Sequence, residues 1–162
     1  RKTFSSGSTS RVNWPHVRSE PCSTDLDPMR KDIHPPKVEG VAMAVVREKD
    51  EDGEDAWFVY LINQNAHAIE NVLVSSRGYG EIEGESRKTS ELRHLLETLG
   101  AKSWARVERI MEDVFPLSNQ YWLSYYVDRT LFDKKYIFLA GSIEEDNFTS
   151  VPLLNKRGVM IE

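Results

Sequence analysis

The sequence predicts a mainly β protein, an antiparallel, Ig-like β-sandwich of about seven strands. Two apolar runs, 41–47 and 56–62, flank an acidic turn that contains Asp52 and Gly53. An Asp-Gly turn between such runs favours a hairpin because both central residues need positive φ. A second aromatic-rich pair of runs covers 121–139. Strands do not alternate with helical patterns, which excludes a parallel α/β sheet.

Charge and apolar content divide the chain into two parts. Residues 1–37 carry seven basic and four acidic side chains and little apolar periodicity, which predicts a disordered or vector-derived tail, with Met29 as a candidate native start. Residues 38–162 form one predicted domain with 14 basic and 22 acidic side chains, a net charge of −8. An acidic domain lacks the basic face that phosphate binding needs, which disfavours nucleic acid as a partner.

Cysteine content and hydropathy indicate a soluble cytoplasmic protein. The one cysteine, Cys22, permits no internal disulfide, and no Cys/His spacing typical of a zinc site occurs. No apolar stretch reaches the length of about 18 residues that a membrane-spanning helix needs. No apolar core of a secretory signal is present near residue 1. We therefore expect neither a bound cofactor nor an association with a membrane.

Alternation of apolar side chains places the remaining strands. Strands are expected over 38–47, 56–63 and 69–76, and the second of these is apolar on both faces, which is typical of a central strand. Residues 78–88 are expected to form a polar loop. Further strands are expected within 104–114, over 121–127 and 131–139, and in two short pieces at 151–154 and 159–161.

Residues 89–99 leave two interpretations open. Four leucines at 92, 95, 96 and 99 have helical spacing, Ser90 is a suitable N-cap, and Gly100 lies at a C-cap position. The alternation of the flanking segments favours a strand instead. The predicted fold therefore retains one short helix near 90–99 as an alternative to a strand.

The segment 75–80 contains the predicted binding residues. Arg77 precedes Gly78, and Tyr79 lies between Gly78 and Gly80, directly after a predicted strand; arginine and tyrosine are favoured at protein interfaces. His67, in the preceding turn, is a candidate polar neighbour. The alternative is a turn whose glycines only provide positive φ.

The acidic turn contains the candidate metal ligands Asp50, Asp52 and Asp55. Calcium prefers such hard oxygen ligands. However, the spacing is not that of an EF-hand loop, and a charged hairpin tip that stays solvated explains the pattern. No metal is therefore predicted.

Two further patterns suggest other chemistry. His67 or His94 beside a carboxylate such as Glu70 could perform acid–base catalysis, although no nucleophile is spaced to complete a triad. The hairpin 121–139 combines aromatic residues with two lysines, a combination that suits single-stranded nucleic acid or a protein interface. These residues are Trp122, Tyr125, Tyr126, Lys134, Lys135, Tyr136 and Phe138.

Several segments resemble a family of small bacterial proteins with a length of about 130 residues, typical of one domain. The segments are 57–63, 70–74, 76–78, 89–94, 101–103, 134–138 and 152–159, and the resemblance covers 29–161. Members are sometimes labelled phenylalanyl-tRNA synthetase alpha subunit. The chain has neither the length nor the arginine-bearing motifs of a class II synthetase domain, so the resemblance implies no activity and no functional residues.

Together these patterns favour a non-catalytic binding or protein-interaction module that self-associates or binds a protein partner. Exposed sheet edges would permit self-association. A small enzyme that uses a histidine–carboxylate pair is the second hypothesis. An RNA-associated factor is the third.

Overall fold

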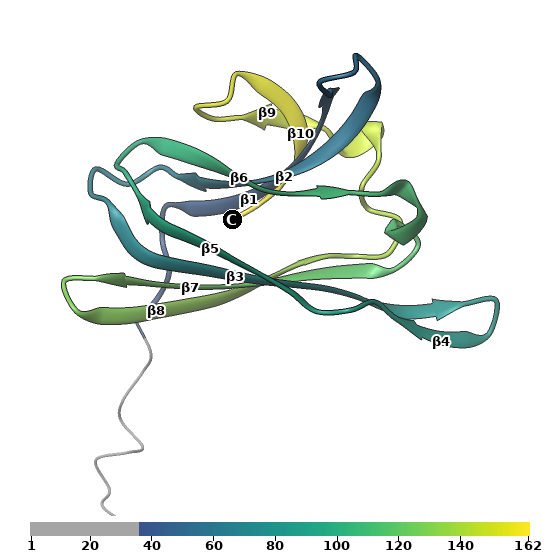
Figure 1. Cartoon of the computed structure of the whole chain (residues 1–162), viewed down its shortest axis with the longest axis horizontal. Helices are drawn as coiled ribbons and strands as arrows, with labels where there is room; N and C mark the ends of the chain where they lie inside the picture. Colours follow the sequence, from purple (N-terminus) through teal and green to yellow (C-terminus); the bar gives the residue numbers. More distant parts are fainter. Residues whose placement is uncertain (1–35) are drawn as a thin grey trace, which may run out of the picture. The chain divides into compact units, whose positions relative to one another are not determined.

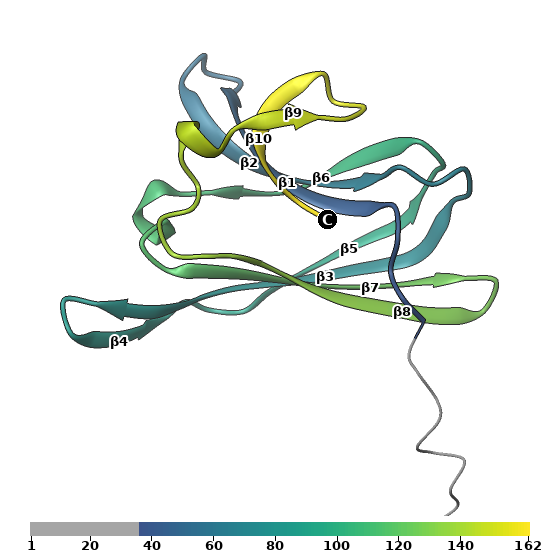
Figure 2. The same cartoon turned by 180° about the vertical axis from the view of Figure 1, so that it is seen from behind.

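The computed structural model describes residues 36–162, which form two antiparallel β-sheets packed face to face (Figures 1 and 2). Apart from Pro36 and Lys37, the predicted tail 1–37 lies outside the described residues. The strands are β1 (Val41–Lys49), β2 (Asp55–Asn63), β3 (Ile69–Ile82), β4 (Glu85–Lys88), β5 (Leu92–Leu99), β6 (Ser103–Ile110), β7 (Ser118–Val127), β8 (Thr130–Phe138), β9 (Thr149–Val151) and β10 (Lys156–Ile161). Two short 3-10 turns, η2 (Glu112–Val114) and η3 (Glu145–Asn147), complete the described part.

The strand order confirms the predicted antiparallel sandwich. The first sheet has the order β6-β2-β1-β10-β9. The second has the order β4-β3-β7-β8, and β5 pairs with β3 ahead of β4, on the edge opposite β7. Both predicted hairpins form, β1–β2 and β7–β8. The described residues contain ten strands rather than about seven, because short strands such as β4 and β9 carry little apolar signal.

The helix considered near 90–99 is wrong, since Leu92–Leu99 forms strand β5. Glu97 has a φ of 55° and Asn71, on the neighbouring part of β3, has a φ of 48°, and the pairing shifts register there. The bulge adds one residue, so Leu96 and Leu99 both turn to the core across a spacing of three. This spacing imitates one turn of a helix. Leu95, on the opposite face, is 68% exposed.

The polar loop expected at 78–88 is also wrong. Strand β3 continues to Ile82, turns through Glu83 and Gly84, and returns as β4. Both turn residues have positive φ, 52° and 80°, as a tight hairpin turn requires. The β3–β4 hairpin projects beyond the rest of the second sheet (Figure 1).

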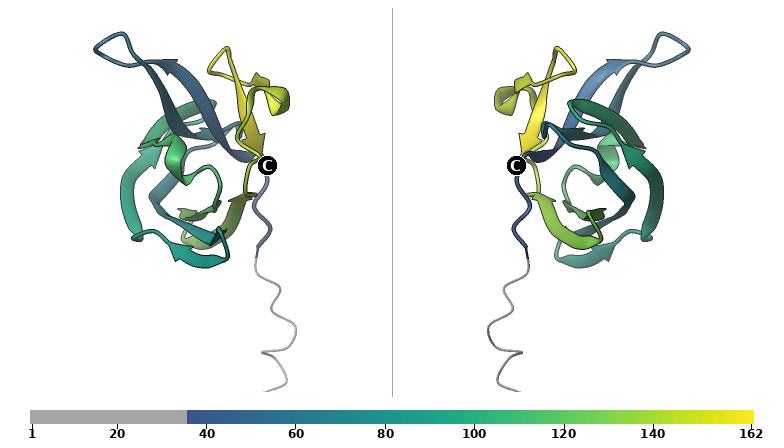
Figure 3. Two further views of the ribbon diagram at one scale, coloured as in Figure 1. Left: turned by 90° about the vertical axis from the view of Figure 1, so that its right-hand side faces the viewer. Right: turned by 90° about the vertical axis from the view of Figure 1, so that its left-hand side faces the viewer.

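Strands β1 and β2 are buried on both faces, as predicted for β2. One face packs between the sheets, and the other forms a second apolar cluster together with residues of the β9–β10 hairpin. The β9–β10 hairpin and the tip of β1–β2 bend away from the second sheet (Figures 1 and 3). The second cluster contains Ala42, Ala44, Val46, Ala56, Phe58, Tyr60, Ile62, Val151 and Leu154, with Met160 packed against it.

Charged side chains cover this second cluster. The Arg106 guanidinium lies 4.1 Å from the centre of the Phe58 ring. Glu48, whose side chain is 9% exposed, accepts hydrogen bonds from Tyr60, Arg106 and Lys156. Burial acts to raise the pKa of Glu48, but the hydrogen bonds from Lys156 and Tyr60 and the nearby positive charges lower it overall. Glu48 is therefore held as a carboxylate.

We predict that Gly158→Ala destabilises the domain by about 1–3 kcal/mol, the usual effect of overpacking. A Cβ at this position would overlap the Val45 carbonyl on the paired strand β1. Gly100→Ala is the matched control, because its Cβ would lie 3.5 Å from Ser103 Oγ, an ordinary contact. Urea unfolding measures both. Equal stabilities for the two variants would contradict the close approach of β1 and β10.

Candidate functional site

The outer face of the second sheet, defined as the side of β5, β3, β7 and β8 that points away from the first sheet, carries the first candidate site. One row across the strands contains Arg93, Ser75, Trp122 and Lys135. Trp122 is 45% exposed, whereas its neighbours Tyr121 and Leu123 are buried. Lys135 Nζ lies 4.5 Å from the Trp122 ring centre, a cation–π distance.

The adjoining row contains Arg77, Gln120 and Ile137. Arg77 donates a hydrogen bond of 3.5 Å to Gln120 Oε1, and its guanidinium lies 5.8 Å from the Tyr79 ring centre. On the other side of Trp122, one row contains Leu95, Leu73, Ser124 and Asp133, and the next contains Glu70, Tyr126 and Leu131.

Arg77 also borders two hollows in the outer face. One, of about 250 Å³, lies among Ser75, Arg93 and Trp122, and the other, of about 370 Å³, lies beside Tyr79 and Lys88. The structure therefore brings the predicted pair Arg77 and Tyr79 together on one surface. Sequence reasoning missed Arg93, because its segment was ambiguous between helix and strand.

His67 does not join this site. It lies in the β2–β3 turn, where its carbonyl accepts a hydrogen bond of 2.9 Å from Asn63 Nδ2. Arg77 lies eight residues beyond the start of β3, about 25 Å along an extended strand. An extended strand separates residues that a flexible loop could have brought together.

The second candidate site is a polar cluster between the sheets, centred on Glu108 of β6. Its Oε2 accepts hydrogen bonds of 3.0 Å from Ser76 Oγ and 2.9 Å from His94 Nε2. The Glu108 side chain is only 12% exposed. Burial raises the pKa of the Tyr121 hydroxyl above its ordinary value, and the adjacent Glu108 carboxylate raises it further. Three strands of one sheet thus direct polar groups at one carboxylate of the other.

An inter-sheet cavity of about 370 Å³ adjoins this cluster. Its polar lining includes Ser76, Glu108, Asn119 and Tyr121. Its apolar lining consists of Leu92, Ile110, Met111 and Val114. Ligand cavities commonly combine an apolar lining with a few polar groups at this size.

The histidine–carboxylate pair in the structure differs from the expected partner. Glu70 lies on the outer face opposite Tyr126, so it is not the carboxylate that meets a histidine. His94 instead meets Glu108, fourteen residues later and on the other sheet. Sequence spacing carries no signal for such a pair, because packing of the two sheets creates it.

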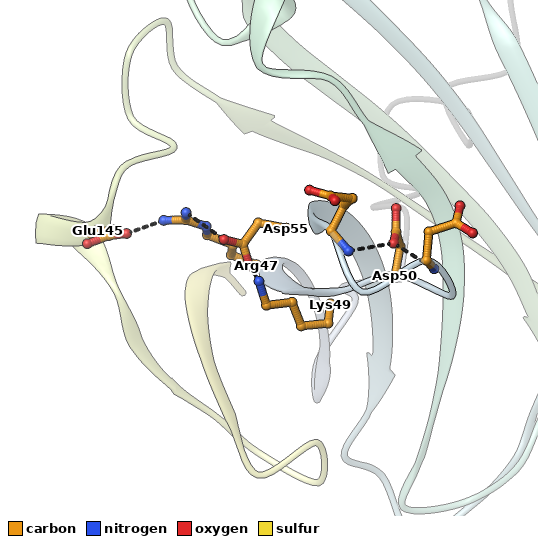
Figure 4. Close-up of polar contacts among 7 residues, drawn as sticks. Arg47, Lys49, Asp50, Asp55 and Glu145 are labelled. Atoms are coloured by element: carbon orange, nitrogen blue, oxygen red, sulfur yellow. Dashed lines mark hydrogen bonds and ion pairs between the residues drawn. The ribbon is translucent and has the colours of Figure 1, made fainter.

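The acidic turn gathers cations and backbone donors around its carboxylates (Figure 4). Asp50 Oδ1 accepts the backbone N–H groups of Asp52 and Glu54, each at 3.0 Å, and Asp50 pairs with Arg109. Asp55 pairs with Arg47 at 3.2 Å and with Lys49 at 2.8 Å. Within residues 36–162, no group of three or more acidic, histidine or cysteine side chains is arranged to hold a metal ion.

Comparisons with known proteins assign no family. No protein-family model matches the chain, and no curated protein matches it. The resemblance to the small bacterial family therefore stays a prediction. Over residues 36–162, no helix is long and apolar enough to cross a membrane.

We predict that Glu108→Ala costs about 2–4 kcal/mol of unfolding free energy, because it leaves the Ser76 hydroxyl and the His94 ring nitrogen without their acceptor. Ser76→Ala is the control. It removes one donor and costs about 1 kcal/mol. Urea unfolding monitored by tryptophan fluorescence measures both, and a smaller loss for Glu108→Ala than for Ser76→Ala would disprove the central role of Glu108.

Proposed function

We propose that the domain is a non-catalytic protein-interaction module that self-associates through the outer face of the second sheet. One observation carries the proposal: the outer apolar cluster of the first sheet is largely covered by other parts of the chain, whereas the outer face of the second sheet is not. The first sheet covers its outer apolar cluster with Arg106, Glu48, Lys156 and the β9–β10 hairpin. The second sheet leaves its outer face exposed.

The exposed face has the composition of an interface. Leu95, Trp122, Tyr126, Leu131 and Ile137 are each at least 36% exposed on it. Several exposed large apolar side chains on one face favour a protein contact. Tryptophan, tyrosine and arginine contribute most of the binding energy in typical interfaces.

The charges of this face are complementary to those of a second copy. Arg77 and Lys135 lie on one side of its centre, and Glu70 and Asp133 lie on the other. In the proposed dimer, a two-fold axis lies in the plane of the interface and runs across the strands, between the Trp122 row and the Ser124 row. This axis places the basic side of one copy against the acidic side of the other. Lys135 would then face Asp133 of the second copy, and Arg77 would face its Glu70. Ile137 and Leu131 would meet in the same way.

We also propose that the sandwich is Ig-like and that the protein is cytoplasmic, on the basis of strand connectivity and cysteine content. The orders β1-β2-β6 and β3-β7-β8 correspond to strands A-B-E and C-F-G of an Ig-like sandwich, which supports that assignment. The single cysteine supports a cytoplasmic location. Fold alone does not imply function, so the interaction role depends on the outer face.

A charge exchange within one chain tests this proposal. Light scattering coupled to size exclusion, on the full chain, should show a dimer. Lys135→Asp and Asp133→Lys should each weaken dimerisation at least about tenfold, because each places like charges together. The double variant should recover the dimer, because it restores opposite charges. Glu54→Lys, on the acidic turn, is the control and should leave the dimer unchanged.

A monomer at every concentration would overturn the proposal, as would a double variant that stays as weak as the single ones. If the protein is a monomer that binds single-stranded RNA, and Trp122→Ala abolishes this binding, the RNA hypothesis is favoured instead. Aromatic side chains support such binding by stacking on bases.

A second candidate function, a small hydrolytic or proton-transfer enzyme, is favoured by the contact between His94 and Glu108. A carboxylate on one ring nitrogen orients the imidazole and leaves the other nitrogen to act as a base. Hydrolysis of an activated ester should then fall with His94→Gln and not with His67→Gln. Equal rates for wild type and His94→Gln would remove this candidate.

A further inference from the structure

We propose that the inter-sheet cavity binds a small organic cation, an ammonium or guanidinium group attached to a short hydrocarbon. This site shares Arg77 with the outer face but does not depend on the interaction role. The cavity residues named above have most of their hydrogen-bond donors engaged, whereas several acceptors face the cavity.

Three side chains that line the cavity already direct their donors to protein acceptors. Ser76 Oγ donates to Glu108, and Thr89 Oγ1 donates to the Ser90 carbonyl. Both donated bonds of Asn119 Nδ2 go to the backbone carbonyls of Val114 and Leu117. The Tyr121 hydroxyl lies beside the Glu108 carboxylate, which raises the pKa of that hydroxyl above its ordinary value in addition to the effect of burial.

The acceptors set the chemistry of the ligand. The Glu108 carboxylate, the Asn119 carbonyl oxygen and the hydroxyl oxygens of Ser76 and Tyr121 all offer lone pairs. Asp113 adds a second carboxylate to the lining. A ligand must therefore supply donors, and a positive charge strengthens each bond to a carboxylate.

The two arginines that border the cavity do not reverse this polarity. Arg77 lies in the outer-face row, where it bonds Gln120 and stacks near Tyr79. Arg109 pairs with Asp50 at 3.3 Å, at the acidic turn. Each guanidinium group therefore directs at least one N–H group to a partner that does not line the cavity.

The apolar lining accounts for the rest of the ligand. Leu92, Ile110, Met111 and Val114 surround the polar end of the cavity. A volume of about 370 Å³ accommodates a ring or chain of a few carbons beside the charged group.

Three probes of one shape test the ligand class on the full chain: cyclohexylammonium, cyclohexanol and cyclohexanecarboxylate. Binding is followed by the amide chemical shifts of Ser76 and Asn119. The ammonium should bind at least about tenfold more tightly than the alcohol, and the carboxylate should bind least. Equal affinities, tighter binding of the carboxylate, or no shift at these amides with any probe would overturn the proposal.

Two variants locate the charge that selects the ligand. Glu108→Gln keeps the shape of the side chain and should weaken ammonium binding about tenfold. Glu54→Gln removes the same charge from the exposed turn and should leave the affinity unchanged. Equal losses in the two variants would refute a specific role of Glu108. If Glu108→Gln does not fold, the three-probe comparison on the wild type decides the proposal.

Discussion

The two-sided burial of β1 and β2 is the constraint on which the rest of the structure depends. Residues such as Val45 and Val59 fill the space between the sheets, while Val46 and Phe58 point the other way into a second apolar cluster. A sheet in such a domain normally exposes one face to water. Here the β9–β10 hairpin and charged side chains exclude water from that face. The Glu48 cluster of Tyr60, Arg106 and Lys156 follows from this requirement, because its members close the cluster while keeping polar ends near solvent.

Glu108 of β6 in the first sheet joins the two sheets by bonding to Ser76 of β3 and His94 of β5 in the second. A carboxylate taken from water is costly unless hydrogen bonds replace the lost hydration, and Ser76 and His94 provide them. Those bonds consume donors and leave acceptors facing the adjoining cavity. One carboxylate thus connects the stability of the domain with the chemistry of its cavity.

The difference between the two outer faces connects packing with function. Elements of the first sheet itself cover most of its outer apolar cluster, and Trp104 of β6, packed against Tyr60, remains 46% exposed there. The second sheet receives no such cover over Trp122 and Leu95. Burying this face against another protein removes apolar area from water and pairs its charges, which favours association. The long hairpin β7–β8 and the bulged strand β5 form part of this outer face.

The sequence by itself determined the β class, the hairpins β1–β2 and β7–β8, and the central position of β2. These follow from side-chain alternation and turn residues, which act over a few positions. Only the tertiary structure decided that Leu92–Leu99 is a strand, because a bulge there depends on β3. It also decided that His94 meets Glu108 while His67 lies apart. Contacts between distant segments arise from sheet packing, for which a local pattern has no period.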